Sequence, residues 1–527
     1  MTSAPRQPRA AAFLVAAGIM LSRVAGLIRQ RVFAHYFGNS DVADAFSAAF
    51  RIPNFLQNLF GEGVLSASFI PVYARLIAED NEEEAGRVAG AIASILFVVA
   101  SILVLGGVLA TPWLIDAIAP GFSGEKRELT IRLVEILFPG AGLLVMSAWC
   151  LGVLNSHRHF FLSYISPVIW NAAMIATLVA FGQSLDRASL AEALAWGSVV
   201  GSGLQFGIQL PVVLRLAQRL RPSLDARAAN VSTVLRNFVP VFIGRGVVQI
   251  SGYVDTLYAS LLQTGAVAGL LYAQTLYMLP VSLFGMSVSA AELPAMSSAT
   301  GDKEEVAVFL RKRLDAGLRQ IAFFIVPSAM AFFALGDVIS GALYQSGEFG
   351  RADAVYVWAI LAGGTVGLLA ITQARLYSST FYALRDTRTP LNYAIVHVTV
   401  SAALGWLFAF PVTAALGVEP KWGAAGLTAA ARLGGVVEFL LLRRALNRRI
   451  GRTGLPRAYL AKLWASAAFG AALGWAAKLV VGTDRPLLTA VAVLVPYGLG
   501  YFGAATLLGV PEVRSALGRL RRLRGGR

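Results

Sequence analysis

The stretch from Val88 to Ile115 reads VAGAIASILFVVASILVLGGVLATPWLI and contains no charged residue. A helix that crosses the hydrocarbon core of a bilayer needs about 20 apolar residues, so this stretch is long enough to span it. Similar runs recur along the 527-residue chain, of which 57% is hydrophobic and 14% is charged. A soluble domain carries roughly 25% charged residues. The runs do not alternate with a period of two, which disfavours a β-barrel. We therefore predict an all-α polytopic membrane protein.

The apolar runs predict about 14 transmembrane helices joined by short connections, which leave no room for a sizeable soluble domain. The predicted spans lie near Ala10–Phe37, Ala43–Leu76, Val88–Ala110, Ile131–Leu154, Phe160–Phe181, Ala191–Leu214, Val234–Leu262, Ala266–Ser298, Ala316–Ala342, Val355–Ala383, Leu391–Leu416, Ala424–Leu442, Leu460–Val481 and Leu487–Leu508. The first run begins like a signal peptide, but it continues through Arg23 and Arg29 without a convincing cleavage site.

A weak internal repeat relates the second span to the eighth. The segment FGEGVLSASFIP ends at Pro71, and the segment LFGMSVSAAELP ends at Pro294, so that Ser66 aligns with Ser289. Internal repeats are typical of transporters whose site lies between two halves. We predict two pseudo-symmetric six-helix bundles, residues 1–228 and 229–450, followed by two extra helices and a basic tail in residues 451–527.

The net charge of +16 is explained by loops on one side of the membrane. With a cytoplasmic N-terminus, basic clusters such as residues 443–457 and 514–527 fall on the cytoplasmic side, loop after loop. This distribution is the positive-inside pattern, and it places the C-terminus in the cytoplasm as well. Anionic membrane lipid is then the partner of these loops, and nucleic acid is not needed to explain them. Of the basic residues in the loops, the opposite side receives only Lys126, Arg127, Arg187, Arg351, Lys421 and Arg485.

Cysteine and histidine give no sign of a metal centre. Cys150 is the only cysteine, so no disulfide within the chain and no cysteine-based metal site can form. The four histidines, His35, His157, His159 and His397, do not cluster in the sequence. We expect no cofactor, and no metal apart from the Na⁺ candidate at Asp255 described below.

Charged residues inside apolar spans carry the functional signal, because each costs roughly 2.5–3.5 kcal/mol at the bilayer centre. They concentrate in the first, second, seventh and eighth spans, which we expect to line a polar cavity. Arginine binds phosphate through two parallel hydrogen bonds, so an arginine-rich cavity indicates an anionic substrate such as a diphosphate. The intramembrane charges are Arg23, Arg29, Arg31, Asp44, Arg51, Glu62, Arg245, Asp255, Glu292 and Arg375.

Structural roles compete with this interpretation, because arginines also extend to the membrane interface or pair with carboxylates. Arg31 lies near a helix end, which favours the interface, and Arg51 fits either role. Asp255 is too far from Arg245 for contact on one helix, so it is a candidate to bind Na⁺ or H⁺. Prolines and glycines also interrupt these spans and predict kinks or bending points: Pro53, Gly61, Gly63, Pro71, Pro240, Pro280 and Pro294.

Several segments resemble one known family. SRVAGLIRQ from Ser22, ADAFSAAFRIPN from Ala43 and GEGVLSASFIPVYA from Gly61 resemble the N-terminal signature of the MurJ (MviN) lipid II flippases. These belong to the multidrug/oligosaccharidyl-lipid/polysaccharide exporter superfamily. FYALRDTRTP from Phe381 resembles the family's loop after the tenth span. The resemblance covers essentially the whole chain.

The resemblance implies a central cationic cavity for the headgroup, a groove for the polyprenyl tail, and location in the cell inner membrane. The implied substrate is lipid II, an undecaprenyl-diphosphate disaccharide-pentapeptide, moved by a monomer without covalent change. Coupling to Na⁺, H⁺ or the membrane potential would drive transport, with Asp255 as the cation-coupling candidate. The candidate substrate-binding residues are Arg23, Arg29, Asp44, Arg51, Gln57, Glu62, Arg245 and Arg375.

Three departures from the family pattern leave the substrate open. The family commonly has Asp where this chain has Gln30, and Arg where it has Gln57 and Thr275. Arg51 and Arg245 are candidates to compensate. A flippase for another polyprenyl-linked glycan is therefore the alternative. A drug–cation antiporter of similar fold would favour a carboxylate-rich cavity, a lipid-linked glycosyltransferase would need a larger extramembrane region, and a scaffold would not explain the buried arginines.

Overall fold

The computed structural model describes residues 9–482 and 485–513, without the side chains at positions 9–16, 62, 243–245, 247, 248 and 251. In this part of the chain the regular structure is helical, apart from one isolated bridge between Ser346 and Phe349. The prediction of an all-α membrane protein is confirmed. Contacts divide the chain into two compact units, Met1–Leu261 and Leu262–Arg527. The predicted repeat boundaries at 228/229 and 450/451 stay predictions.

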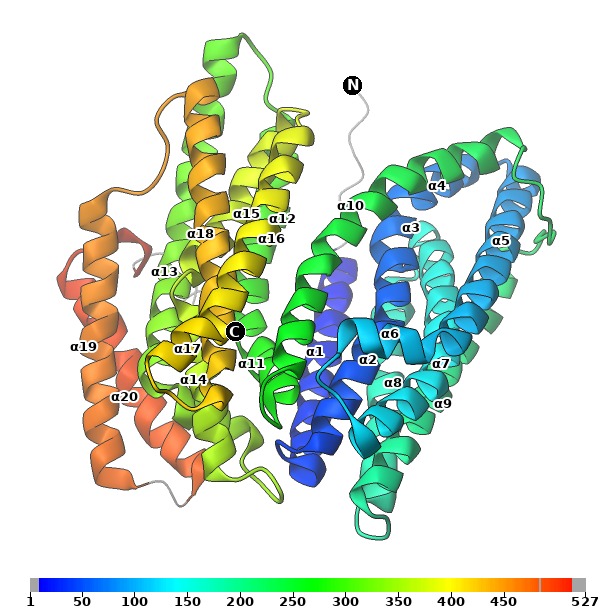
Figure 1. Ribbon diagram of the computed structural model, residues 1–527. Helices are drawn as coiled ribbons and strands as arrows, with labels where there is room; N and C mark the ends of the chain where they lie inside the picture. Colours follow the sequence, from blue (N-terminus) through cyan, green and yellow to red (C-terminus); the bar gives the residue numbers. More distant parts are fainter. Residues whose placement is uncertain (1–8, 483–484, 514–527) are drawn as a thin grey trace. The chain divides into compact units, whose positions relative to one another are not determined.

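The first unit is drawn in blue, cyan and green in Figure 1. Its helices are α1 (Arg9–Phe37), α2 (Asp41–Phe60), α3 (Glu62–Ser68), α4 (Ile70–Ala78), α5 (Glu82–Leu109), α6 (Thr111–Ile118), α7 (Gly124–Ser156), α8 (Phe160–Phe181), α9 (Arg187–Leu216) and α10 (Ala229–Ser260). Within this unit α7 packs against α2, α5 and α9, and α8 packs against α1 and α9.

The second unit runs from green through yellow to red in Figure 1. Its helices are α11 (Ala266–Pro280), the π-helix η1 (Val281–Met286), α12 (Ser287–Ser297), α13 (Lys303–Tyr344), α14 (Arg351–Thr365), α15 (Leu368–Ala383), α16 (Arg388–Ala409), α17 (Pro411–Ala415), the 3₁₀-helix η2 (Pro420–Trp422), α18 (Gly423–Ile450), α19 (Arg457–Val481) and α20 (Pro486–Leu507). The long helix α13 packs against α14, α15, α19 and α20, while α16 packs mainly against α18.

Ten helical segments of the described chain are long and apolar enough to cross a membrane, and the bent pair α14–α15 makes eleven. The predicted number of about 14 is compatible with these segments, although they do not establish it. The last two predicted spans correspond to α19 and α20, which pack against each other. Glycine makes this approach close, because a Cβ atom at Gly470 would lie 2.6 Å from the carbonyl oxygen of Tyr497.

The predicted interruptions are confirmed in the second and eighth spans, and the tenth span has a bend that was not predicted. The second span is not one continuous helix, because it breaks at Gly61 between α2 and α3 and again at Phe69 between α3 and α4. The eighth span widens into a π-helix directly after Pro280. The tenth bends by 50° between α14 and α15, around Gly367. Pro53 and Pro240 lie inside α-helices that continue past them.

Local sequence explains where the helices begin. Ser40 caps α2, because its hydroxyl accepts a hydrogen bond from the N–H of Ala43 at 3.3 Å. Asp302 and Glu305 form a reciprocal capping box at the start of α13. Asp186 accepts from the N–H groups of Ala188 and Ser189 at the start of α9. These caps satisfy backbone donors that the helix itself cannot pair.

Candidate functional site

Arg29 of α1 is held in the first unit by aromatic rings. Its guanidinium carbon lies 4.9 Å from the ring centroid of Trp170 on α8 and 5.4 Å from that of Phe50 on α2. One guanidinium nitrogen also lies 3.7 Å from the sulfur of Met174. Ring faces attract a cation through the aromatic quadrupole without using its N–H groups in strong hydrogen bonds. Among the residues that the structure describes, no carboxylate forms an ion pair with Arg29.

The two aromatic residues also border a small, partly open pocket in the first unit. Trp170 is fixed there, since its indole N–H lies 3.2 Å from both the carbonyl and the hydroxyl oxygen of Ser198. Phe50 stacks on Trp170 with ring centroids 5.7 Å apart. The pocket is lined by Phe50, Pro53, Asn54, Leu137, Gly140, Ala141, Leu144, Trp170, Ser198 and Ser202.

Arg51 of α2 is engaged differently, because it connects two helices of the first unit. Its guanidinium donates to the carbonyl oxygen of Gly252 and the hydroxyl of Thr256, both on α10. In return, Tyr253 of α10 donates its hydroxyl to the carbonyl oxygen of Arg51 at 3.2 Å. These contacts describe a brace between α2 and α10. The predicted substrate contact of Arg51 stays a prediction.

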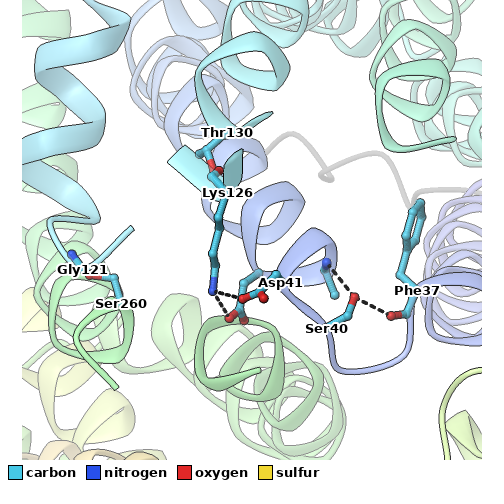
Figure 2. Close-up of polar contacts among 9 residues, drawn as sticks. Phe37, Ser40, Asp41, Gly121, Lys126, Thr130 and Ser260 are labelled. Carbon is cyan, nitrogen blue, oxygen red and sulfur yellow. Dashed lines mark hydrogen bonds and ion pairs between the residues drawn. The ribbon is translucent and has the colours of Figure 1, made fainter. Parts of the chain in front are cut away.

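Asp44 is buried, with 1% of its side chain exposed, and forms an ion pair at the start of α2. Lys126, in the first turn of α7, places its ammonium 2.7 Å from Asp44 and 2.8 Å from Asp41. Figure 2 shows Lys126 reaching Asp41 beside the capped start of α2. The ammonium also lies 4.3 Å from the ring centroid of Phe122. Both acids occupy the first helical turn, where the helix dipole favours negative charge.

The loop before α7 is fixed to the end of α10 close to this ion pair. The N–H of Gly121 donates to the hydroxyl of Ser260 at 3.2 Å (Figure 2). Glycine is required by the close approach, since a Cβ atom there would lie 2.0 Å from the carbonyl oxygen of Ser260. Sequence analysis had treated Lys126 only as a loop charge. Its role in binding Asp41 and Asp44 was missed, because its partners are more than 80 residues away in the chain.

The remaining first-unit candidates lie on the same helices. Arg23 is exposed on α1, Gln57 is half-buried on α2, and Asp255 is half-buried on α10. Asp255 directly precedes Thr256, the hydroxyl that Arg51 contacts. The side chains of Glu62 and Arg245 lie outside the described residues, so their predicted roles stay predictions. Glu292, another intramembrane acid, pairs with Arg313 in the second unit at 2.8 Å.

The second unit holds its own cationic cluster around the predicted residue Arg375 of α15. Arg375 is exposed and lies within electrostatic range of Arg432 and Glu438 of α18 and Tyr277 of α11. The guanidinium carbon of Arg432 lies 4.0 Å from the ring centroid of Tyr277, which matches the way Arg29 is held. The Nε atom of Arg432 is buried and has no hydrogen-bond partner among the described residues.

Next to this cluster, His397 of α16 contacts Glu438 of α18, with Nδ1 and Oε2 2.7 Å apart. Sequence analysis missed Arg432, His397 and Glu438 as a group. Their signal was present, since Arg432 and Glu438 are charges inside one apolar span and such charges are costly without partners. His397 was considered only as a metal ligand, and its acidic partner lies 41 residues away.

Two positions that depart from the family pattern, Gln30 and Thr275, carry uncharged side chains within helices. The Thr275 hydroxyl donates to the carbonyl oxygen of Leu271 on its own helix at 2.9 Å. Gln30 is 5% exposed, and its amide nitrogen has no hydrogen-bond partner in the described part of the chain. Gln30 does not supply the negative charge, and Thr275 does not supply the positive charge, that the family commonly has at these positions.

A family model described as lipid II flippase MurJ matches residues 33–486. A lipid II flippase MurJ from Burkholderia cenocepacia is 32% identical over 438 residues, which cover 82% of each chain. The chain belongs to the MurJ lipid II flippase family. A probable lipid II flippase MurJ from Rhizobium tropici is 31% identical over 528 residues, covering 97% of this chain and 96% of the relative. The resemblance of the sequence motifs to the MurJ family is therefore confirmed over most of the chain.

Solved structures agree on the fold. A structure described as lipid II flippase MurJ in an inward closed conformation matches with a TM-score of 0.77 and 23% identity, covering 94% of this chain and 98% of that one. An inward-facing multidrug resistance MATE transporter of the MOP superfamily matches with a TM-score of 0.66 and 16% identity, covering 83% and 98%. The chain therefore has the helical fold shared by MurJ and MATE transporters.

Proposed function

We propose that this protein moves lipid II from the cytoplasmic to the periplasmic leaflet of the cell inner membrane by alternating access. Family membership over residues 33–486 supports the substrate, because the relatives carry that name. The basic loops support an orientation with both termini in the cytoplasm. The protein would act as a monomer and leave its substrate chemically unchanged.

The observation that carries the proposal is the environment of Arg29. The guanidinium is positioned by cation–π contacts with Trp170 and Phe50, which do not neutralise its charge and so leave it able to bind an anion. A diphosphate matches a guanidinium, because its oxygens accept two parallel charge-assisted hydrogen bonds. Binding the anion would also offset the cost of placing the cation within the membrane. Arg23, Arg245, Glu62 and Gln57 remain proposed neighbours in substrate binding.

The proposal is tested by growth of a bacterium depleted of its own lipid II flippase. Wild type should restore growth, whereas Arg29→Ala should fail and Arg29→Lys should restore it poorly, because lysine lacks the planar fork. Arg127→Ala is the matched control, since Arg127 pairs with Asp116 at 2.7 Å in an exposed position. All variants are compared at equal membrane abundance. If well-expressed wild type does not restore growth, lipid II is not its substrate.

A second candidate substrate is another polyprenyl-linked glycan. The observation that favours it is the loss of family charges at Gln30, Gln57 and Thr275, none of which is replaced at its own position. Both candidates share the diphosphate, so the two are separated by the glycan. Binding of the purified protein to undecaprenyl diphosphate carrying either the peptidoglycan headgroup or an unrelated oligosaccharide decides between them. Tighter binding of the unrelated glycan would favour the alternative.

Coupling to a cation is part of the same proposal. Asp255 is half-buried on α10, which supports it as a carboxylate for Na⁺ or H⁺. The prediction is that Asp255→Asn reduces the response of transport to an imposed Na⁺ or pH gradient, while binding of the undecaprenyl-diphosphate substrate is retained.

A further inference from the structure

His397 and Glu438 contact each other inside the predicted spans of the second unit. His397 lies six residues after Leu391, where its predicted span begins, and Glu438 lies four residues before Leu442, where its span ends. At 1.5 Å per residue, these positions are about 9 and 6 Å inside the hydrocarbon core, on the side to which the basic loops are assigned. Their side chains are 22% and 16% exposed.

Glycine brings the two helices together at this level. A Cβ atom at Gly434 of α18 would lie 2.1 Å from the hydroxyl oxygen of Ser401 and 2.9 Å from the carbonyl oxygen of His397. Ala431, Gly434 and Glu438 share one face of α18, since they are spaced by three and four residues. This face meets His397 and leaves the histidine ring between the Ala431 carbonyl and the Glu438 carboxylate.

The contacts of the ring determine how many protons the pair holds. Nε2 of His397 lies 3.3 Å from the carbonyl oxygen of Ala431, and Nδ1 lies 2.7 Å from Oε2 of Glu438. A carbonyl oxygen only accepts, so the first contact is favourable when Nε2 carries hydrogen. The second contact then needs one more proton, located on Nδ1 or on Oε2. In either location the pair is neutral overall and both contacts are hydrogen bonds.

Removing the shared proton breaks this arrangement. If hydrogen stays on Nε2, the Nδ1 lone pair faces the Glu438 carboxylate. If hydrogen moves to Nδ1, the Nε2 lone pair faces the Ala431 carbonyl. One hydrogen bond is lost in each case, and a net negative charge remains in a poorly solvated site, which is costly.

A nearby positive charge lowers the free-energy cost of the negative charge that remains when this proton is released. Arg375 of α15 lies close enough to act on the charge of Glu438, as does the hydroxyl of Tyr382. Arg375 also lies within electrostatic range of Arg432 of α18, which contacts the ring of Tyr277. Other charged groups of the packed helices lie toward helix ends or are paired. Arg388 starts α16, Arg443, Arg444, Arg448 and Arg449 lie toward the end of α18, Lys421 and Glu419 pair before α18, and Arg351 and Asp353 start α14. On α13, Arg311 binds the carbonyl oxygen of Ile450, Asp315 pairs with Arg319, and Asp337 pairs with Lys478.

We propose that the His397–Glu438 pair is a proton-binding site that takes up and releases one proton during each transport cycle. The coupling follows from charge. When no anion is bound, Arg375 stabilises the Glu438 carboxylate and favours proton release. An anionic headgroup that binds Arg375 removes that stabilisation and favours proton uptake. Only this coupling step rests on the proposed function, since proton binding itself requires no substrate.

The first test is direct titration by NMR with ¹⁵N-labelled histidine in the full chain in lipid nanodiscs. The chain has four histidines, so the His397→Gln variant assigns the signal of His397. We expect the signals of the His397 ring nitrogens to change with pH, and this transition to shift in Glu438→Gln. The matched control is Asp337→Asn, which breaks a similarly buried ion pair with Lys478 in the same unit. A His397 signal that does not respond to pH, or that is unchanged in Glu438→Gln, overturns the proposal.

The second test is transport of a fluorescent undecaprenyl-diphosphate glycan in liposomes with the voltage clamped at zero. If one proton moves with each substrate, one unit of pH gradient shifts the leaflet ratio about tenfold. Wild type and Asp337→Asn should show this shift, and Glu438→Gln should not. Transport that ignores the gradient in wild type overturns the coupling but leaves the proposed function standing. Absence of transport in wild type contradicts the proposed function and the coupling, while the NMR titration still decides the proton site.

Discussion

Two cations in the first unit are held in opposite ways. Lys126 is bound by the carboxylates of Asp41 and Asp44 at the start of α2. Arg29 is bound by the ring faces of Trp170 and Phe50. Carboxylates neutralise a cation, whereas rings position it and leave its charge available to a ligand. The comparison teaches that an intramembrane charge is identified as structural or functional by the chemistry of its neighbours.

The largest effect is expected at Lys126. Lys126→Met removes the ammonium from the buried carboxylate of Asp44, and breaking a buried pair typically costs about 3–5 kcal/mol. Unfolding in detergent, followed by circular dichroism, should show a loss in this range. The control is Arg132→Met on the same helix, because Arg132 pairs with Glu192 in a half-exposed position. Equal stability of the two variants would contradict a structural role for Lys126.

Arg51 and Arg29 sharpen the comparison as a matched pair. Arg51→Met loses hydrogen bonds from a charged donor to Gly252 and Thr256, for which about 1.5–3 kcal/mol of unfolding free energy is expected. Arg29→Met should cost less stability, because it loses ring contacts and a weak hydrogen bond to the sulfur of Met174, yet it should abolish transport. The two measurements are detergent unfolding and liposome transport. A variant of Arg29 that transports normally would place it with the structural charges.

The rings around Arg29 should have a moderate effect. Trp170→Leu removes a cation–π contact of about 0.5–2 kcal/mol, so transport should fall roughly 2- to 30-fold if that contact holds the productive geometry. Trp170→Phe keeps an aromatic face and should retain more activity. Both variants lose the indole N–H to Ser198, so the difference between them reports on the ring alone. Equal activities would show that the ring face does not matter.

The smallest effect concerns Asp386, in the loop between α15 and α16. A hydrogen bond from the hydroxyl of Thr389, supported by the Thr389 N–H and by Arg449, lowers the pKa of Asp386 below its usual value. Its stabilising contribution is therefore complete above the unfolded pKa of about 4 and is lost as pH falls through the lower folded pKa. Detergent unfolding from neutral to acidic pH should show a slightly weaker acid dependence in Asp386→Asn than in wild type.

Sequence alone could predict the fold class and the residues that break the expected pattern. Charges such as Arg29 stand out within apolar runs, and the break at Gly61 follows from a glycine in a motif. The partners could not be predicted, because helix packing decides them. Asp44 looked like a cavity acid until its contact with Lys126 was seen. Charged residues that look alike in the sequence can therefore be distinguished as structural ion-pair residues or candidate ligand-binding residues only from the three-dimensional structure.

The second unit shows a different limit. His397 was examined for metal ligands within the sequence, and its partner Glu438 belongs to another helix. Arg432 and Glu438 lie six residues apart in one span, a spacing that by itself indicates no shared contact on a helix. The contact between His397 and Glu438 depends on the close approach of α16 to α18.

That approach restricts how this region can change during evolution. Gly434 leaves no space for a methyl group against Ser401 and the backbone of His397. An alanine at position 434 needs space for its methyl group. The hydroxyl of Ser401 is the nearest side-chain group whose loss would provide part of that space. We expect residues 401 and 434 to covary by size across relatives, with Gly434→Ala found only in chains that carry glycine or alanine at position 401 and in which the backbone at position 397 has moved away. The order of substitutions would thus be restricted by the contact between these two helices.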